Sequence, residues 1–223
     1  MKDIIKSLRK QFSKYNIDGY IVPKNDEYFT EYSSINRLKI ISNFSGSAGI
    51  AIILKKENYL FTDGRYSIQS QLESGKNFKV LDIENIINCK LFKNITLGVD
   101  PKLFTYEQIK RFFFKYNKIK FINENLIDKI KKQNKKKIFK FFPLKKDIVG
   151  EDSFSKLNKI SQYLKINNSD YIFVSAPENV AWILNIRGRD VPNSPLPNCR
   201  LLISKTKKIF LISKIKNCEN LIK

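Results

Sequence analysis

The sequence predicts an α/β fold arranged as two tandem domains, and three observations support this prediction. Segments in which apolar residues recur at helical spacing alternate with short apolar runs typical of strands. The 223 residues are 42% hydrophobic, which is enough for each domain to bury its own core. A helix, an asparagine stop and a strand beginning near Asp-Tyr-Ile occur in this order at 4–22 and again at 154–174. We therefore expect a first domain at 1–130, a linker at 131–150 and a second, incomplete domain at 151–223.

The first domain is expected to begin with a helix, because apolar residues recur at helical spacing: Ile4, Ile5, Leu8, Phe12 and Tyr15. A later helix is expected to begin at Thr105, since Gln108 stands three residues on, as in a capping box. The other elements are read from apolar runs that turn residues separate. The expected strands and helices are 20–22, 50–54, 59–62, 78–81 and 95–99, and 4–15, 66–72 and 105–116.

The second domain follows a lysine-rich run at 131–137, where repulsion between like charges favours an extended linker. Pro177 is suited to the first turn of a helix, and Trp182 is expected to face the core from that helix. These elements are too few to cover the sheet of a complete domain. The chain is therefore expected to stop inside this domain. The expected helices and strands are 154–164 and 177–183, and 170–174, 200–204 and 209–212.

Composition limits the possible functions. The formal net charge is +21, but only seven of the 42 basic residues are Arg. An excess of Lys beside abundant Asn and Ile indicates drift in composition, so a nucleic-acid partner is not expected. The sequence has no His, which excludes Ser-His-Asp, Cys-His and His-containing zinc sites. Cys89, Cys199 and Cys218 form no disulfide or zinc pattern and fit a reducing cytoplasm. Neither a signal peptide nor a membrane span is expected.

Three motifs are more specific. Asn-Phe-Ser-Gly-Ser-Ala-Gly at 43–49 is a turn of small residues that leads into a strand. Phe-Thr-Asp-Gly-Arg-Tyr at 61–66 follows it closely. Ala-Trp-Ile-Leu-Asn-Ile-Arg-Gly at 181–188 has Asp190 two residues beyond it. In this order and spacing, the motifs resemble the N-terminal creatinase-like domains of the Xaa-Pro aminopeptidases (aminopeptidase P), and the resemblance covers essentially the whole chain.

The resemblance implies mixed sheets flanked by helices in both domains, with the second domain truncated. It also implies that the C-terminal pita-bread domain, which would bind two divalent metals, manganese in most cases, is absent. No catalytic residue, metal ligand or cofactor is therefore expected within the chain, and it is predicted to be inactive alone. The implied role is to shape the substrate entrance and support homo-oligomer contacts. The substrates, reached through the full-length protein, would be peptides with proline in the second position.

Arg65 is the residue that we most expect to contact substrate, together with Asp63 and Tyr66. It stands where a helix begins, a place at which the helix dipole disfavours a cation. It is also an Arg in a chain that uses Lys five times as often, and only a guanidinium holds a carboxylate with two parallel hydrogen bonds. The resemblance places this Arg at the active-site entrance, although pairing with a carboxylate of the fold is an equally open alternative.

Neighbouring motif residues also have structural interpretations. Asp63 can cap the next helix, and Gly64 can adopt the positive φ of a turn. Gly188 fits a helix stop, and Arg187 fits the negative end of the helix before it. The small residues of 43–49 suit a tight turn.

A second class of function stays open. Creatinase-like domains also occur in non-catalytic modules that bind peptides, such as the large subunit of the FACT histone chaperone, and a basic, His-free chain fits a peptide- or nucleic-acid-binding module. The Thr-Asp-Gly-Arg-Tyr motif favours the peptidases. The tandem arrangement argues against creatinase and prolidase, which have a single domain of this kind.

Overall fold

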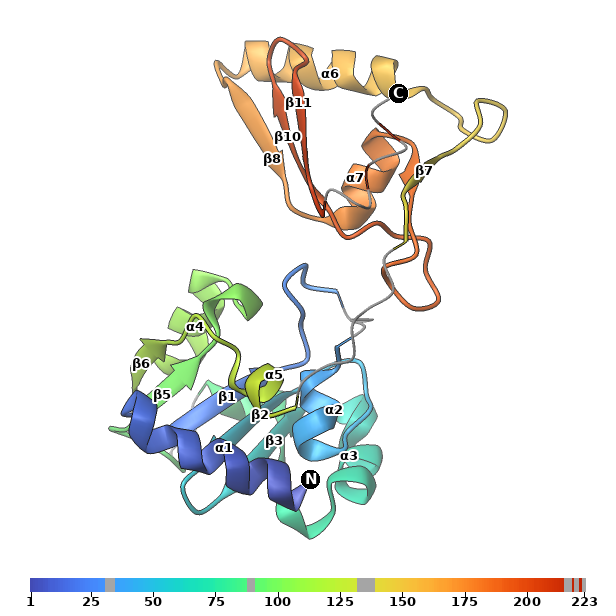
Figure 1. Cartoon of the computed structure of the whole chain (residues 1–223). Helices are drawn as coiled ribbons and strands as arrows, with labels where there is room; N and C mark the ends of the chain where they lie inside the picture. The colour runs from blue at the N-terminus through green and yellow to red at the C-terminus, as the bar shows by residue number, and fades with distance from the viewer. Residues whose placement is uncertain (31–34, 88–90, 132–138, 215–217, 219–220, 222–223) are drawn as a thin grey trace. The chain divides into compact units, whose positions relative to one another are not determined.

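The computed structural model describes residues 1–30, 35–87, 91–131, 139–214, 218 and 221. The chain divides into two compact units, Met1–Asn134 and Lys135–Lys223 (Figure 1). Each unit buries apolar side chains of its own. The predicted α/β class is confirmed for both. Most of the lysine-rich run at 131–137 lies outside the described residues. None of the helices in the described ranges is long and apolar enough to cross a bilayer.

The first unit is built on a six-stranded mixed sheet with the strand order β4-β3-β2-β1-β5-β6. β1 pairs antiparallel with β2, and β2 pairs antiparallel with β3. The pairs β3–β4, β1–β5 and β5–β6 are parallel. The strands are β1 (Gly19–Pro23), β2 (Ile50–Leu54), β3 (Asn58–Thr62), β4 (Lys79–Asp82), β5 (Thr96–Val99) and β6 (Lys118–Phe121).

Helices cover both faces of this sheet (Figure 1). Neighbouring residues of β1 show the two layers, because successive strand side chains point to opposite faces. Tyr20 and Val22 pack into one core cluster and Ile21 into the other. The first cluster includes residues of α1 (Lys2–Tyr15), α2 (Arg37–Ser42) and α5 (Leu126–Ile130), and the second includes residues of α4 (Tyr106–Phe113).

Local signals account for several of these elements. Ile5, Leu8 and Phe12 are buried along α1, as the spacing predicts. Thr105 and Gln108 form the predicted capping box of α4. The helix expected at 66–72 is α3 (Ser67–Ser74). Short 3-10 helices complete the unit: η1 (Gly64–Tyr66), η2 (Gly75–Asn77), η3 (Ile83–Ile86) and η4 (Pro101–Leu103).

The second unit contains a smaller, antiparallel sheet with the order β11-β10-β8, and a separate β7–β9 pair. Helices α6 and α7 pack on one face of the sheet, through Leu157 and Ile160 of α6 and Val180 and Ile183 of α7. Phe141, in the stretch expected to be a linker, is buried in this core. The elements are β7 (Phe142–Pro143), α6 (Ser153–Ile166), β8 (Tyr171–Val174), α7 (Pro177–Ile183), β9 (Ile186–Arg187), β10 (Arg200–Ser204) and β11 (Ile209–Ile212).

The other face of the second sheet is exposed within the unit. Leu202 of β10 pairs with Phe173 on one side and with Phe210 on the other, so the three side chains form a row. Phe173, Phe210 and Ile212 are about half exposed. We call these four residues the outer apolar face.

The described cysteines, Cys199 and Cys218, belong to the second unit. Cys199 is buried in the second core and Cys218 is partly buried, and both are free thiols. Burial raises the pKa of Cys199 to about 12, so its thiol stays protonated and poorly nucleophilic. Cys89 lies outside the described residues.

Candidate functional site

The candidate site lies at the edge of the first sheet where the parallel strands end. Because β1 and β3 are both antiparallel to β2, they run in the same direction, and β5 runs parallel to β1. The residues that follow these strands therefore meet at one edge. In α/β sheets this edge is where ligands bind. Asp63 follows β3 here, and Asp100 follows β5.

The turn after β3 presents Arg65. Asp63 accepts hydrogen bonds from the Arg65 backbone N at 3.0 Å, from Nε at 3.0 Å and from Nη2 at 2.9 Å. Asp63 thus caps η1, as predicted, and also fixes the guanidinium. The Arg65 hydrogen bonds lower the pKa of Asp63, so the carboxylate stays ionised. The Arg65 side chain is nevertheless 71% exposed, which leaves it accessible to solvent.

Tyr66 joins this turn to the small-residue motif at 43–49. Its hydroxyl is hydrogen bonded to the Ser47 hydroxyl at 2.8 Å, and this bond lowers the pKa of Tyr66. Its ring packs edge-on against Phe44 with centroids 5.4 Å apart, and the Arg65 Cζ lies 5.4 Å from the Tyr66 centroid. A Cβ on Gly46 would lie 2.2 Å from the Phe44 ring, so the turn needs glycine there. The structure therefore brings together the two first-domain motifs and all three predicted site residues.

Gly64 does not have the conformation that the sequence predicted. Among the described glycines only Gly75 has a positive φ, so the expectation of a left-handed Gly64 is wrong. A Cβ on Gly64 would meet no atom within 4 Å. Neither backbone strain nor packing within the described residues accounts for a glycine at this position.

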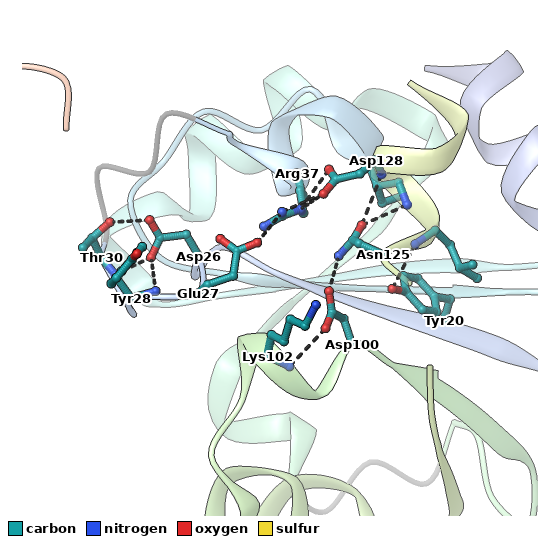
Figure 2. A network of polar contacts seen from close by, with 12 residues as sticks. Tyr20, Asp26, Glu27, Tyr28, Thr30, Arg37, Asp100, Lys102, Asn125 and Asp128 are labelled. Atoms are coloured by element: carbon teal, nitrogen blue, oxygen red, sulfur yellow. Dashed lines mark hydrogen bonds and ion pairs between the residues drawn. The ribbon is translucent and has the colours of Figure 1, made fainter. Parts of the chain in front are cut away.

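A second polar cluster at the same edge surrounds a buried arginine, and the fold engages its charged groups (Figure 2). Arg37 is 3% exposed; its Nε and Nη2 donate to the Asp128 carboxylate at 2.7–3.1 Å, and Nη2 donates to Glu27 at 2.7 Å. Burial alone would lower the pKa of Arg37, but the bonds to Asp128 and the charge of Glu27 raise it. The guanidinium therefore stays charged and joins α2 to α5. We call Arg37, Glu27 and Asp128 the Arg37 ion network.

The carboxylates around this network are also engaged by the fold (Figure 2). Asp100 accepts hydrogen bonds from Asn125 Nδ2 and Lys102 N, both at 3.0 Å. Asp26 accepts three bonds at 2.9 Å from the backbone of Tyr28 and from the backbone and hydroxyl of Thr30. Sequence reasoning missed this cluster, although Arg37 carries the same signal as Arg65, an Arg in a Lys-rich chain. The cluster stabilises the loops of this edge, and we assign it no chemistry.

The third motif, at 181–188, also has a structural role. Lys156 is buried, and its Nζ donates to Trp182 O at 2.6 Å and to Asn185 Oδ1 at 2.7 Å. Arg187 Nη1 donates to Ala181 O at 3.2 Å, which confirms its predicted place at the end of α7. These contacts hold the turn after α7 against α6.

Two predictions about this motif are wrong. Trp182, expected in the core, is 58% exposed, because Val180 and Ile183 share the buried face and Trp182 points away from Val180. Its ring centroid lies 4.1 Å from Lys156 Nζ. Gly188 does not stop the helix, which ends at Ile183. A Cβ on Gly188 would lie 2.7 Å from Pro197 Cα, so close chain contact explains the glycine.

A metal centre does not fit the residues present. Within the described ranges, no group of three or more His, Cys, Asp or Glu side chains could hold a metal ion. The carboxylates at the sheet edge are bound to Arg37, Arg65 or backbone amides instead. We therefore assign no step of metal-assisted hydrolysis to these residues.

Comparisons with known proteins agree with this architecture. Models of the creatinase/prolidase N-terminal domain match residues 4–130 and 131–222. Xaa-Pro aminopeptidase 1 of Dictyostelium discoideum is 29% identical over 235 residues, which cover 95% of this chain and 38% of the relative. Aminopeptidase P2 of Arabidopsis thaliana is 31% identical over 220 residues, covering 89% of this chain and 31% of the relative. The chain spans about a third of the length of these relatives.

A solved structure shows the same fold. The crystal structure of an X-prolyl aminopeptidase from Caenorhabditis elegans, described as a cytosolic enzyme with a di-nuclear active site, matches with a TM-score of 0.86 at 22% identity. The match covers 97% of this chain and 39% of that chain. The chain therefore belongs to the creatinase/prolidase N-terminal domain family and is homologous to the N-terminal third of Xaa-Pro aminopeptidases.

Proposed function

We propose that this chain is the substrate-side, non-catalytic portion of a metal-dependent Xaa-Pro aminopeptidase, in which Arg65, Asp63 and Tyr66 contact the peptide. One observation carries the proposal: Asp63 fixes the Arg65 guanidinium in a position that is still mostly exposed. Asp63 uses the Nε–Nη2 edge of the guanidinium, so the peptide would be bound through the N–H groups on its other side. A guanidinium that is already held in place positions a carboxylate or carbonyl group at low entropic cost. The hydrolytic step, at two divalent metals that we expect to be manganese, belongs to residues outside this chain. We also propose a cytoplasmic homo-oligomer.

The open space at Gly64 supports this proposal. Because nothing among the described residues lies within 4 Å of a Cβ built there, the missing side chain leaves room beside Arg65. Glycine commonly serves where a ligand approaches the backbone closely. A peptide lying across Gly64 would reach Arg65 and the Tyr66 ring over which its guanidinium lies.

The test uses a chimera in which residues 1–223 replace the matched part of the Dictyostelium relative. Arg65→Ala should lower kcat/KM for a tripeptide with proline second by roughly 10- to 100-fold, the size expected for a lost charged hydrogen bond. Arg65→Lys should recover little, because Lys lacks the fork. Arg111→Ala, which removes an exposed Arg from α4, is the matched control. An Arg65→Ala chimera as active as the control contradicts the proposal.

The variant Gly64→Ala tests whether the peptide contacts this glycine, because the substitution should affect activity without destabilising the fold. We expect the free energy of unfolding to be unchanged or higher by up to about 1 kcal/mol, because the φ is ordinary and the site is open. Activity of the chimera should still fall, since the methyl group would occupy the peptide's space. For a chimera without activity, peptide binding to the 223-residue chain is followed by the NMR shift of the Arg65 Nε–H. Normal activity or binding in Gly64→Ala would exclude contact across this glycine.

A non-catalytic peptide- or nucleic-acid-binding module is the competing function, and a net charge of +21 is compatible with it. Binding of single-stranded nucleic acid would be titrated with salt, since phosphate contacts give a steep dependence. Tight, salt-sensitive binding that is unaffected by Arg65→Ala would support the module over the peptidase.

A further inference from the structure

A pocket in the first unit lies away from the Arg65 turn. Its volume is about 320 Å³. It lies where α1 passes Asn58, the first residue of β3, whereas Asp63 follows the last residue of that strand. Three cationic side chains, two amides and one apolar side chain line the pocket, and no carboxylate does. The lining residues are Lys2, Ile5, Lys6, Arg9, Asn58 and Asn77.

Arg9 is fixed in this pocket by the fold. Its Nε donates to Leu54 O at 2.8 Å and its Nη2 donates to Asn58 Oδ1 at 2.9 Å. Asn58 is oriented in turn, because its Nδ2 donates to Asn77 O at 2.8 Å. Nη1 of Arg9 has no acceptor among the described residues. One guanidinium amino group is therefore held in place with its hydrogen-bonding capacity unused.

Lys2 and Lys6 add mobile charge beside this fixed group. They stand one helical turn apart, and Arg9 follows three residues after Lys6. No described residue forms an ion pair with either lysine. Lysines recur at every fourth position of α1, at 2, 6, 10 and 14, and like charges at this spacing repel each other. An anion bound at the pocket would relieve that repulsion.

We propose that this pocket binds a small, soluble anion that carries phosphate groups. Phosphoryl oxygens accept charged hydrogen bonds from guanidinium and ammonium groups, and the two lysines can follow the ligand while Arg9 fixes its position. The apolar face of α1 cannot insert into a membrane, because Ile5, Leu8 and Phe12 are buried in the core. A soluble ligand is therefore favoured over a lipid headgroup. This proposal does not depend on the aminopeptidase assignment.

The test is isothermal titration of the full chain with sodium tripolyphosphate at constant ionic strength. The paired variant Lys2→Gln and Lys6→Gln should bind tripolyphosphate more weakly and raise the dissociation constant by at least about tenfold. The control variant, Lys10→Gln and Lys14→Gln, removes the same charge from the same helix but outside the pocket. It should raise the dissociation constant by less than about twofold. Equal losses in both pairs, or no saturable binding to the unaltered chain, would overturn the proposal.

Competition distinguishes the two sources of phosphate. Free pyrophosphate should displace tripolyphosphate, while vesicles of phosphatidylcholine with phosphatidic acid should not. Displacement by the vesicles alone would overturn the soluble ligand in favour of a lipid headgroup. Thermal melts of all variants check the fold, and because the four substituted lysines are exposed, we expect unchanged melting temperatures.

Discussion

The two units of the chain begin with the same local structure but place it in different surroundings. Helices α1 and α6 each have 14 residues. A left-handed asparagine follows each helix, Asn16 with φ 47° and Asn168 with φ 50°. A short strand comes next, β1 in the first unit and β8 in the second. Yet Tyr20 at the start of β1 is 1% exposed, and Tyr171 at the start of β8 is 56% exposed.

The difference comes from residues far away in the sequence. β1 has a strand on each side and a core cluster against each face. Among the described strands, β8 pairs with β10 alone, at the edge of its sheet, and one face of that sheet packs on helices. The same helix–asparagine–strand pattern therefore specifies the local structure, whereas residues elsewhere in the chain determine how deeply the strand is buried.

Replacing the two tyrosines should give the largest contrast. Tyr20→Ala removes a buried ring and should lower the free energy of unfolding of the first unit by about 3–5 kcal/mol. Tyr171→Ala should change that of the second unit by less than about 0.5 kcal/mol, since its ring is largely exposed. Trp182 is the only Trp and belongs to the second unit, so its fluorescence follows that unit, while circular dichroism follows both. Similar losses in both variants would refute the contrast.

Sequence periodicity predicted the elements well where the signal is local. The capping box at Thr105, the asparagine stops and most strands depend on residues within one or two turns of each other. Side-chain orientation at Trp182 was predicted wrongly, because it depends on which face of α7 packs on the sheet. The space that Gly188 needs comes from Pro197, which no local pattern shows.

The candidate site shows the same limit. Arg65 was singled out as an Arg in a Lys-rich chain, and Arg9 and Arg37 carry the same signal. The structure binds Arg37 to Asp128, 91 residues away, and Arg9 to Leu54, 45 residues away. An Arg in this Lys-rich chain therefore indicates a position where a guanidinium forms specific hydrogen bonds. The exposure of its side chain then indicates whether the partner belongs to the fold or to an external ligand.

The aspartates before the two strands should give a smaller contrast. Asp18 accepts hydrogen bonds from Lys55 Nζ at 2.6 Å and Thr96 N at 2.9 Å, so it joins β1 to β5. Asp170 pairs with Lys205 at 2.7 Å and is more exposed. Asp18→Asn should lower the free energy of unfolding by about 1 kcal/mol at neutral pH, and Asp170→Asn by less than about 0.5 kcal/mol.

The pH dependence of Asp18 sharpens this prediction. The Lys55 and Thr96 hydrogen bonds lower its pKa below the ordinary value of 3.8. A carboxylate with a lowered folded pKa stabilises the fold above its unfolded pKa and loses this effect as the pH falls through the folded value. The gap between the unaltered chain and Asp18→Asn should therefore close as urea titrations are repeated below pH 3.8. A gap that persists in acid would assign the effect to packing.

The outer apolar face of the second unit should tolerate polar substitution with little change in stability. Phe173 and Phe210 are 54% and 51% exposed on either side of Leu202. Because Thr keeps a high strand propensity, the paired variant Phe173→Thr and Phe210→Thr should change the free energy of unfolding by less than about 1 kcal/mol. It should also reduce binding of a hydrophobic dye and concentration-dependent light scattering, since exposed edge strands with apolar faces associate.

The matched control makes the same kind of substitution on the inner face of the same strands. Ile172→Thr and Leu211→Thr lie on the same two strands but against α6 and α7, and should cost about 2–4 kcal/mol together. A comparable cost for the outer pair would mean that another surface covers Phe173 and Phe210 in solution. A small cost would show that β8 differs from β1 only in what lies against it, because the same strands would then tolerate polar residues on one face and not on the other.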